Sequence, residues 1–447
     1  MKQLVLNEYI DSQKIGRYQV FILGICLLLM IMDGYDIQAM AYAAPFIIED
    51  WGVDKPALGM AFSASILGLF IGSLTLSWCS DKFGRRPILM LSTLAFSILM
   101  IATPHVTSIE QLTVIRFITG IFLGGIMPNA MAYSSEIVPN GQRVFAMILI
   151  STGYTIGGMI GGFISAWLTP IGGWHAIFYF GGVIPLIIFV IMLFTLPESL
   201  RYMGAKKENH DKIRYWLNKM FPNCGITNTT EIIHHADTGV KPSPLQLFKG
   251  NRAFFTTTIW IISALNMMSL YFLASWLPTL GKESGLSMQN AMYIGSTLLL
   301  GGTIGSVMIA LKINKLGFYK VLIPVFIVAV ISVGLIGFTS SVVPLMFLAV
   351  FVAGFAVVGG QPAINALSAD YYPIKLRTTG VGWSIGIGRL GSVIAPVFGG
   401  YLSTFLTINH LFLIAAIPSV TIIGILLIQL KSLRSNKAVS NVEAASV

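Results

Sequence analysis

The chain has 447 residues, of which 55% are hydrophobic and 10% are charged. Soluble domains carry about 25% charged residues, so this composition excludes a soluble globular protein and indicates a polytopic membrane protein. The formal net charge is +10, but all except four of the 28 Lys and Arg residues lie in the tails or in alternate loops between apolar segments. The positive charge therefore indicates membrane topology and argues against nucleic-acid binding.

Twelve apolar segments follow one another, each close to the length of about 20 residues that crosses a bilayer. The first has no signal-peptide cleavage site, so we expect it to be retained as a membrane span. The predicted fold is an all-α polytopic membrane protein with 12 transmembrane helices in two six-helix halves. The predicted spans are 18–46, 57–79, 87–104, 109–135, 144–168, 174–196, 253–279, 290–313, 319–338, 343–367, 378–402 and 408–430.

The loop charges predict the orientation of these spans. Lys55 and Lys282 fall in loops on the opposite side of the membrane from the other loop cations. Because Lys and Arg favour cytoplasmic loops, both termini and the central loop are predicted to be cytoplasmic. The expected organisation is a cytoplasmic N-terminal tail at 1–17, an N-terminal six-helix bundle at 18–196, a cytoplasmic central loop at 197–252, a C-terminal six-helix bundle at 253–430 and a cytoplasmic C-terminal tail at 431–447.

Two acids interrupt the first span. Asp33 and Asp36 lie three residues apart within the apolar sequence LLMIMDGYDIQAMAYAA, at 28–44. Each carboxylate in a membrane helix costs about 2.5 to 3.5 kcal/mol on insertion scales, so the pair indicates a function such as proton or ion handling. The i, i+3 spacing places both acids on one face of the helix.

The loop after the second span carries a charged motif, which reads Asp81-Lys82-Phe83-Gly84-Arg85-Arg86. It resembles the signature loop of the major facilitator superfamily, although the glycine usual four residues before the aspartate is Ser77 here. The resemblance implies the major facilitator fold and a gating latch, in which a carboxylate near a helix N-terminus would gain about 0.3 to 1 kcal/mol. The candidate gating residues are Asp81, Gly84, Arg85, Arg86, Glu136 and Arg143.

The fourth span carries the cation Arg116, which lies about 28 Å above the inner face at 1.5 Å per residue. The same rise places Asp33 and Asp36 about 22 to 27 Å above that face. The two acids and the arginine can therefore share one layer of the first half, although being level does not show that they face each other.

R-x-x-x-G at this place resembles a second superfamily motif, associated with proton coupling. The glycines of the fifth span favour close helix packing.

The two halves repeat each other at a shift of 234 residues. Duplicated six-helix halves place a substrate cavity at their interface near the membrane midplane, the arrangement used for alternating access. The matching positions are Gly120, Pro128, Ala132, Glu136, Pro139, Arg143 and Gly157 with Gly354, Pro362, Ala366, Asp370, Pro373, Arg377 and Gly391.

The central loop contains no phosphate-binding G-x-x-x-x-G-K-[ST] motif. His234 and His235 have no Cys or acid at ligand spacing, and the three cysteines fit neither a zinc motif nor a disulfide framework. We therefore expect no metal, no cofactor and no enzymatic activity.

The end of the sixth span, Pro197-Glu198-Ser199-Leu200-Arg201, is similar to the P-E-S-x-R of many sugar and organic-ion carriers.

Two polar positions stand out in the second half. Asn266 lies within the apolar seventh span, and Arg389 lies twelve residues beyond Arg377 in the eleventh. Twelve residues of helix extend about 18 Å, which places Arg389 near the midplane. A guanidinium there is expected to meet a carboxylate of the protein or of a ligand.

With Asp33-Gly34-Tyr35-Asp36 the resemblance narrows to the aromatic acid:proton symporter family, bacterial inner-membrane carriers of aromatic acids. Further matching motifs are Arg116-Phe117-Ile118-Thr119-Gly120, Ser275-Trp276-Leu277-Pro278-Thr279 and Gly386-Ile387-Gly388-Arg389. The resemblance implies that Asp33 and Asp36 are the transport-essential acids and that Arg116 and Arg389 are required membrane charges.

The predicted activity is proton-coupled uptake of a 4-hydroxybenzoate-, protocatechuate-, vanillate- or benzoate-type acid by a monomer that alternates access. Arg389 would hold the carboxylate, and Asp33 or Asp36, switched by a movable Arg116, would carry the proton. Alternatives are a carrier of a non-aromatic acid such as muconate, a multidrug antiporter, and a membrane sensor for aromatic acids. Gly157-Gly158 replaces the antiporter Gly-Pro pair, and the sequence offers no signalling domain. The candidate contacts to the substrate beside Arg389 are Tyr35, Asn266, Tyr271, Phe272 and Trp383.

Overall fold

A computed structural model describes residues 3–205, 210–221, 231–233, 243–249, 252–339 and 342–445. The predicted all-α class is confirmed, since helices make up almost all of this part of the chain. Two three-residue strands, β1 (Gln3–Val5) and β2 (Glu231–Ile233), pair in parallel. His234 and His235, which we predicted to form no metal site, lie outside the described residues.

Eleven helices in the described ranges are long and apolar enough to cross a membrane. The predicted spans 144–168 and 174–196 both fall within one of them, α6 (Asn140–Thr195). Helical conformation is broken inside α6 at Gly172 and Gly173, and Gly173 has a positive φ of 62°. The break falls between the two predicted spans, and the total of twelve spans stays a prediction.

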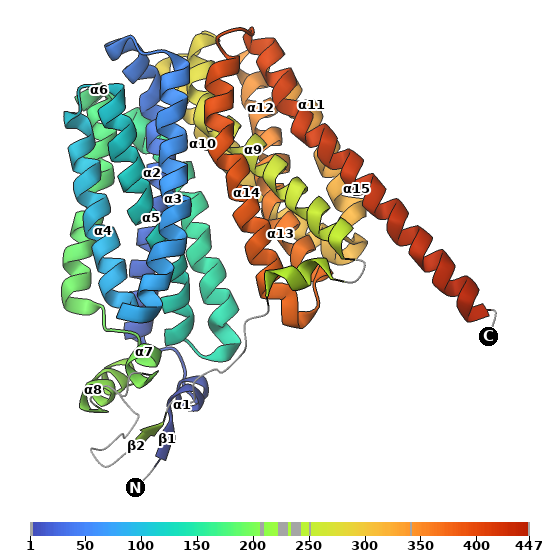
Figure 1. Ribbon diagram of the computed structural model, residues 1–447. Coiled ribbons are helices and arrows are strands. Elements are labelled where there is room, and N and C mark those ends of the chain that lie inside the picture. The colour runs from blue at the N-terminus through green and yellow to red at the C-terminus, as the bar shows by residue number, and fades with distance from the viewer. Residues whose placement is uncertain are drawn as a thin grey trace. The chain divides into compact units, whose positions relative to one another are not determined.

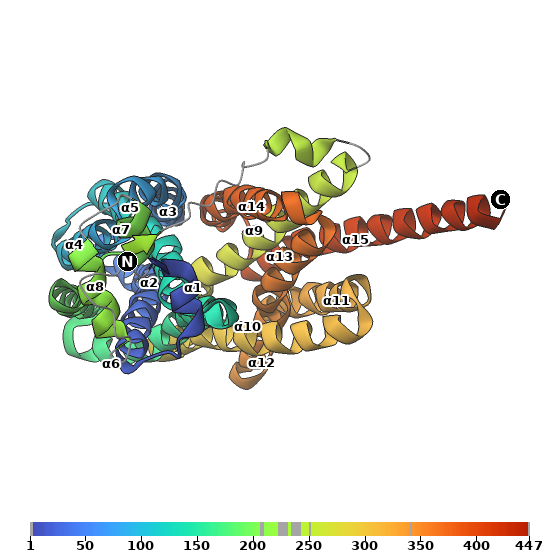
Figure 2. The ribbon, with the colours of Figure 1, turned by 90° about the horizontal axis from the view of Figure 1, so that it is seen from below.

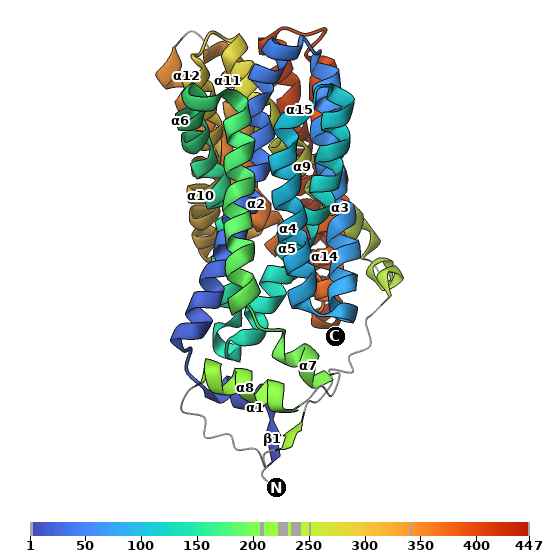
Figure 3. The ribbon, with the colours of Figure 1, turned by 90° about the vertical axis from the view of Figure 1, so that its left-hand side faces the viewer.

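Contacts divide the chain into two compact units, of which unit 1 comprises 1–39 and 64–240. Its helices run side by side from blue to green, and both strands lie near one end of that bundle with α1, α7 and α8 (Figures 1 and 3). The helices that contribute to unit 1 are α1 (Leu6–Ser12), α2 (Arg17–Trp51), α3 (Lys55–Phe83), α4 (Arg85–Ala102), η1 (Thr103–His105), α5 (Ile109–Ile137), α6, α7 (Leu200–Ala205) and α8 (His210–Met220).

Unit 2 comprises 40–63 and 241–447, and so includes the end of α2 and the start of α3. Its remaining helices, yellow to red, form a second bundle (Figures 1 and 2). They are η2 (Pro244–Phe248), α9 (Ala253–Glu283), α10 (Met288–Leu316), α11 (Phe318–Ile336), η3 (Gly337–Thr339), α12 (Val343–Ala353), the π-helix η4 (Gly354–Val358), α13 (Gly359–Tyr371), α14 (Ile374–Leu402) and α15 (Ile408–Ala445).

The two lysines predicted to face outward both form ion pairs within unit 2. Lys55 Nζ lies 2.7 Å from Glu283 Oε1, and Lys282 Nζ lies 3.7 Å from Glu49 Oε1. Their positive charges are thus partly balanced by acids of neighbouring segments. This pairing explains in part how two lysines are accommodated in loops that otherwise lack basic residues.

Glycines bring the helix backbones of unit 1 into contact. A Cβ atom added to Gly34 of α2 would lie 1.9 Å from the carbonyl oxygen of Tyr154, and one added to Gly157 of α6 would lie 1.8 Å from that of Ile31. Neither position has room for a side chain unless the helices separate. This contact is the packing role predicted for the fifth-span glycines, and it fixes the rotation of the helix that carries both acids.

Candidate functional site

A buried ion pair joins α5 to α2 inside unit 1. Arg116 Nη1 donates to Asp36 Oδ1 at 2.8 Å, and Arg116 Nη2 donates to Asp36 Oδ2 at 2.7 Å. The side chains are only 1% and 0% exposed. Planar, two-bonded pairing of this kind fixes the orientation of both groups, and its strength depends on the exclusion of water.

Soft and aromatic groups complete the surroundings of the guanidinium. Its carbon lies 5.9 Å from the centroid of the Phe178 ring, and Nη1 lies 3.4 Å from the Met100 sulfur. Nη2 also approaches Ser65 Oγ at 3.4 Å, whereas the buried Nε has no hydrogen-bond partner among the described residues. Asp36 bonds Arg116 through both of its oxygens, and breaking the pair would leave a nearly apolar site around a cation.

The second acid, Asp33, is also buried, at 2% exposure, one turn from Asp36 on α2. Tyr35, predicted to contact the substrate, instead donates from its hydroxyl to the carbonyl oxygen of Ile177 on α6 at 2.9 Å. Its ring packs against Phe180, with centroids 5.4 Å apart. In this conformation Tyr35 connects two helices of unit 1.

The gating candidates gather at one end of the bundle of unit 1. Arg85 Nε donates to Glu136 Oε1 at 2.7 Å, and the Ser199 hydroxyl donates to the other oxygen of the same carboxylate. Asp81 is exposed, and its closest ion-pair distance, to Arg85 Nη2, is 3.6 Å. Arg143, on α6, instead pairs with Asp11 of the N-terminal tail at 3.1 Å.

The carboxylate at the start of α4 belongs to Glu198, which we did not include among the candidate gating residues. Glu198 Oε1 accepts the backbone N–H groups of Arg85 and Arg86 at 3.0 and 3.1 Å. Gly84 has a φ of 104°, and a Cβ there would lie 2.4 Å from Glu198 Oε2, so only glycine fits beside this cap. The P-E-S-x-R resemblance was the signal for Glu198, but nothing in the sequence connected that motif to the second-span loop.

The electrostatic setting of Glu198 is mixed. Burial raises the pKa of its carboxyl group, and the backbone N–H groups of Ser199, Arg86 and Arg85 oppose that shift by stabilising the ionised form. The raised pKa means that desolvation dominates. Glu198 therefore caps the N-terminus of α4 although burial disfavours its ionised carboxylate.

In unit 2 the polar site consists of amides. Asn266 on α9 is fully buried, and its Nδ2 donates to Gln361 Oε1 at 2.7 Å and to the Val357 carbonyl at 3.1 Å. Gln361 Nε2 in turn donates to Asn365 Oδ1 at 3.2 Å. Val357 lies in the π-helix η4, a rare element that often marks functional sites. Sequence reasoning found Asn266 but missed Gln361 and Asn365, whose spacing on α13 was a weak signal.

The two remaining predicted contacts on α14 occupy different surroundings. Arg389 is half-buried, next to Gly388, where a Cβ would lie 2.6 Å from Ser263 Oγ on α9. Trp383 is 43% exposed and stacks on Trp260, with ring centroids 5.8 Å apart. In this conformation Trp383 stacks on an aromatic residue of α9, and Arg389 follows a glycine that packs closely against α9.

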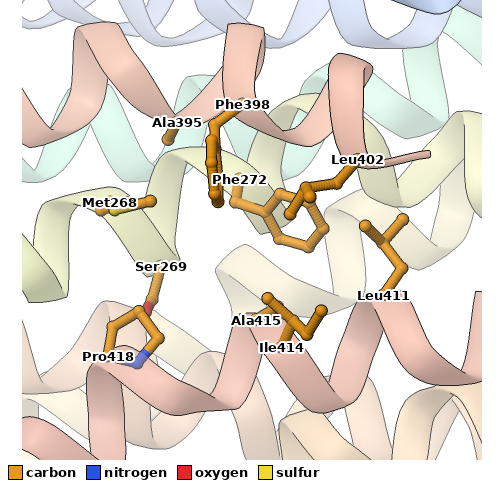
Figure 4. A pocket seen from close by; sticks show the side chains of 10 residues that line it. All are labelled: Met268, Ser269, Phe272, Ala395, Phe398, Leu402, Leu411, Ile414, Ala415 and Pro418. Carbon is orange, nitrogen blue, oxygen red and sulfur yellow. The ribbon is translucent and has the colours of Figure 1, made fainter. Parts of the chain in front are cut away.

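Phe272 lines an apolar cavity between α9, α14 and α15, whereas Tyr271, the residue before it, is half-buried (Figure 4). The Ser269 hydroxyl is the polar group of the cavity wall. The volume of the cavity is about 30 Å³, which accommodates about one water molecule. The cavity is too small for an aromatic ring in this conformation.

The described part of the chain contains no group of three or more His, Cys, Asp and Glu residues arranged to hold a metal ion. The buried polar groups described in the two units are ionic and hydrogen-bonding groups. Unit 1 offers a buried carboxylate–guanidinium pair beside a second acid, and unit 2 offers a buried amide network. Such groups bind and release ions and protons.

Buried ionisable groups on long apolar helices define a multi-pass membrane transporter, and the comparisons with known proteins agree. A sequence profile described as Major Facilitator Superfamily matches residues 24–339 and 294–445. The chain belongs to the major facilitator superfamily and, within it, to the aromatic acid:proton symporter family that its motifs predicted. The prediction of a transporter and not an enzyme is thereby confirmed.

Two relatives illustrate the family. The 4-hydroxybenzoate transporter PcaK of Acinetobacter baylyi is 35% identical over 90% of this chain and 88% of its own length. The gallate transporter of Pseudomonas putida is 32% identical over 93% of this chain and 92% of its own length. Among solved structures, a D-xylose–proton symporter superposes with a TM-score of 0.70 at 16% identity, covering 91% of this chain and 97% of that one, which supports the fold.

Proposed function

We propose that this protein imports a small aromatic carboxylate together with protons, by alternating access of its two halves to the two sides of the membrane. The observation that carries the proposal is the two-bonded Arg116–Asp36 pair, buried one turn from a second buried acid. Relatives that transport 4-hydroxybenzoate and gallate support an aromatic acid as the substrate.

Asp33 is the proposed proton carrier. Both oxygens of Asp36 accept bonds from Arg116, so a proton on Asp36 would remove an acceptor and leave the guanidinium partly unpaired in an apolar site. Asp33 is the second buried acid of α2, one turn from this pair, and in the proposed mechanism it takes up and releases the coupled proton. The Arg116–Asp36 pair would stay intact beside it during transport.

Arg389 is the proposed anchor for the substrate carboxylate, because its fork of donors matches two carboxylate oxygens. Asn266, on the helix that α14 contacts, supplies a second specificity group. Its buried Oδ1 has no hydrogen-bond partner in the described structure and is an acceptor suited to a phenolic hydroxyl. Together the two groups would select an acid with a polar ring substituent.

The proposed setting is a bacterial inner membrane, with both termini on the cytoplasmic side and a monomer as the working unit. The orientation is supported by the concentration of Lys and Arg in the tails and alternate loops. The monomer is supported by the internal duplication, which supplies both halves of a carrier from one chain.

The decisive experiment measures uptake of labelled 4-hydroxybenzoate, gallate, benzoate and muconate by cells that lack their own carriers for these acids. The parent should concentrate at least one aromatic acid, and an uncoupler should abolish that accumulation. Asp33→Asn should abolish accumulation while the protein remains in the membrane. Energy-independent exchange of labelled for unlabelled substrate should survive in this variant, because exchange does not require net proton movement.

Three outcomes would contradict the proposal. Preferential uptake of muconate would replace the aromatic substrate class with a dicarboxylate. Accumulation that resists the uncoupler would refute proton coupling. An Asp33→Asn variant that still concentrates substrate would exclude Asp33 as the coupling acid and leave Asp36 as the candidate.

A further inference from the structure

A second, polar cavity lies at one end of unit 1, where α6 ends and α4 begins. Its volume is about 340 Å³, and it is open to one side of the bundle. Arg86 of α4, Glu198 and the α8 residues Lys212 and Trp216 contribute its polar wall. Phe194, at the end of α6, lies on its apolar side. None of these residues belongs to the ion pair or to the amide network.

The cavity marks a boundary between apolar and polar surface. Along the last turns of α6 exposed apolar side chains point outward, and Phe194 is 79% exposed. The helix α8 lies across this end of the bundle (Figure 3). Its Ile213 and Leu217 side chains are buried, while Trp216 lines the cavity. An amphipathic helix with tryptophan at such a boundary is typical of the membrane–water interface.

The cavity has an excess of positive charge. Lys212 is exposed and forms no ion pair with a described residue. Arg86 donates from Nη2 to the Leu193 carbonyl at 2.9 Å, but its buried Nε has no hydrogen-bond partner in the described structure. The opposing carboxylate, Glu198, is engaged by three backbone N–H groups at the start of α4 and after its own residue.

We propose that this cavity binds the headgroup of an anionic phospholipid from the adjoining leaflet. Arg86 and Lys212 would hold the phosphate, since guanidinium and ammonium groups both pair with phosphate oxygens. The acyl chains would lie along the exposed apolar end of α6, beside Phe194. Basic pockets between membrane helices on the cytoplasmic side bind anionic headgroups in this way.

Such a lipid would connect three elements that carry separate parts of the latch. Arg86 is the neighbour of Arg85, which pairs with Glu136, and Glu198 caps the same helix start. The bound headgroup would therefore join the second-span loop, the end of α6 and the interfacial helix α8. This role is independent of the transported substrate, so its failure would leave the transport proposal intact.

The test is native mass spectrometry of the purified full-length protein, titrated with phosphatidylglycerol or with phosphatidylcholine of identical acyl chains. We expect selective retention of phosphatidylglycerol by the parent. Lys212→Gln should weaken that retention about fivefold, the effect of removing one cation near an anionic surface. The matched control is Lys320→Gln, which removes an exposed lysine from the first turn of α11.

The control and a competitor decide between specific and general binding. Equal retention of the two lipids would overturn the proposal, because no headgroup charge would be recognised. Equal weakening by Lys212→Gln and Lys320→Gln would overturn it as well, since diffuse attraction would then suffice. Displacement of the lipid by inorganic phosphate at a similar concentration would assign the cavity to a soluble anion. Unchanged thermal unfolding of Lys212→Gln without lipid would confirm that the variant is folded.

Discussion

The two units share a backbone packing scheme but differ in their buried polar chemistry. In unit 1 a Cβ on Gly157 would lie 1.8 Å from the Ile31 carbonyl oxygen. In unit 2 a Cβ on Gly391, 234 residues later, would lie 2.1 Å from the Ala264 carbonyl oxygen. The duplicated halves thus keep the same close contact between their first and fifth spans.

The buried polar groups, unlike the glycine contacts, do not match between the two units. The positions 234 residues after Asp36 and Arg116 hold Leu270 and Val350, so these two positions of unit 2 cannot form the equivalent ion pair. Its own amide, Asn266, corresponds to Met32. Helix packing therefore restricts backbone positions and leaves each half free to acquire its own chemistry. The buried ion pair of unit 1 is charged, whereas the buried network of unit 2 consists of neutral hydrogen-bonding groups.

The largest effect should come from breaking the ion pair. Arg116→Met should lower the free energy of unfolding by about 3 to 5 kcal/mol, because Asp36 is left buried and uncompensated. Adding Asp36→Leu to the same chain should recover most of that loss, since the unpaired charge is gone. Thermal unfolding of the detergent-purified variants measures both effects. If the free energy of unfolding of Arg116→Met lies within about 0.5 kcal/mol of the parent's, water or another group must form hydrogen bonds with Asp36.

The shared glycine contact should respond alike in the two units. Gly157→Ala and Gly391→Ala should each destabilise by about 1 to 3 kcal/mol, because the added methyl group forces packed backbones apart. Gly386→Ala is the matched control on α14, where a Cβ would meet nothing within 4 Å. The control should be neutral or stabilise by about 0.5 to 1 kcal/mol, the helix preference of Ala over Gly. A tolerated Gly391→Ala would show that the repeat is conserved in sequence but not in packing.

The amide network should be less costly to break than the ion pair. Asn266→Leu should destabilise by about 1 to 3 kcal/mol, because the Val357 carbonyl and Gln361 Oε1 lose their donor. Gln361→Met alone should cost less, since the Asn266 amide keeps the Val357 carbonyl. Measured against the double variant, the two changes should be coupled by about 0.5 to 3 kcal/mol, as for residues in direct contact. Additive losses would mean that the two amides act independently.

The smallest expected change concerns binding and leaves stability unaltered. Arg389→Lys keeps the charge but loses the planar fork, so affinity for an aromatic acid should fall about tenfold, the loss of one charge-assisted bond. Titration calorimetry of the purified parent and variant with the acid and with its uncharged amide measures this. A parent that binds acid and amide equally, or a variant that binds the acid as tightly as the parent, would exclude Arg389 as the anchor.

Local sequence was sufficient for much of the fold and for the candidate acids. Apolar segments of membrane length predict spanning helices because lipid forces each backbone to bond within its own helix. Asp33 and Asp36 stand out because a membrane span disfavours ionisable groups, so they were visible without knowledge of any neighbour. Arg116, Arg389 and Asn266 were found by the same reasoning, and the family motifs supported the transport function.

Tertiary structure decided which of these groups meet. Arg116 was level with both acids by helix rise, but its partner Asp36 lies 80 residues away, and glycine contacts such as Gly34 with Tyr154 set the rotation of the helix that carries it. Glu198 caps a helix start 112 residues distant, and Gln361 bonds Asn266 across 95 residues. Hydropathy and spacing measure depth and face along one helix, whereas these partners depend on how separate helices are turned toward one another. That rotation is a property of packed surfaces, and no single segment contains it.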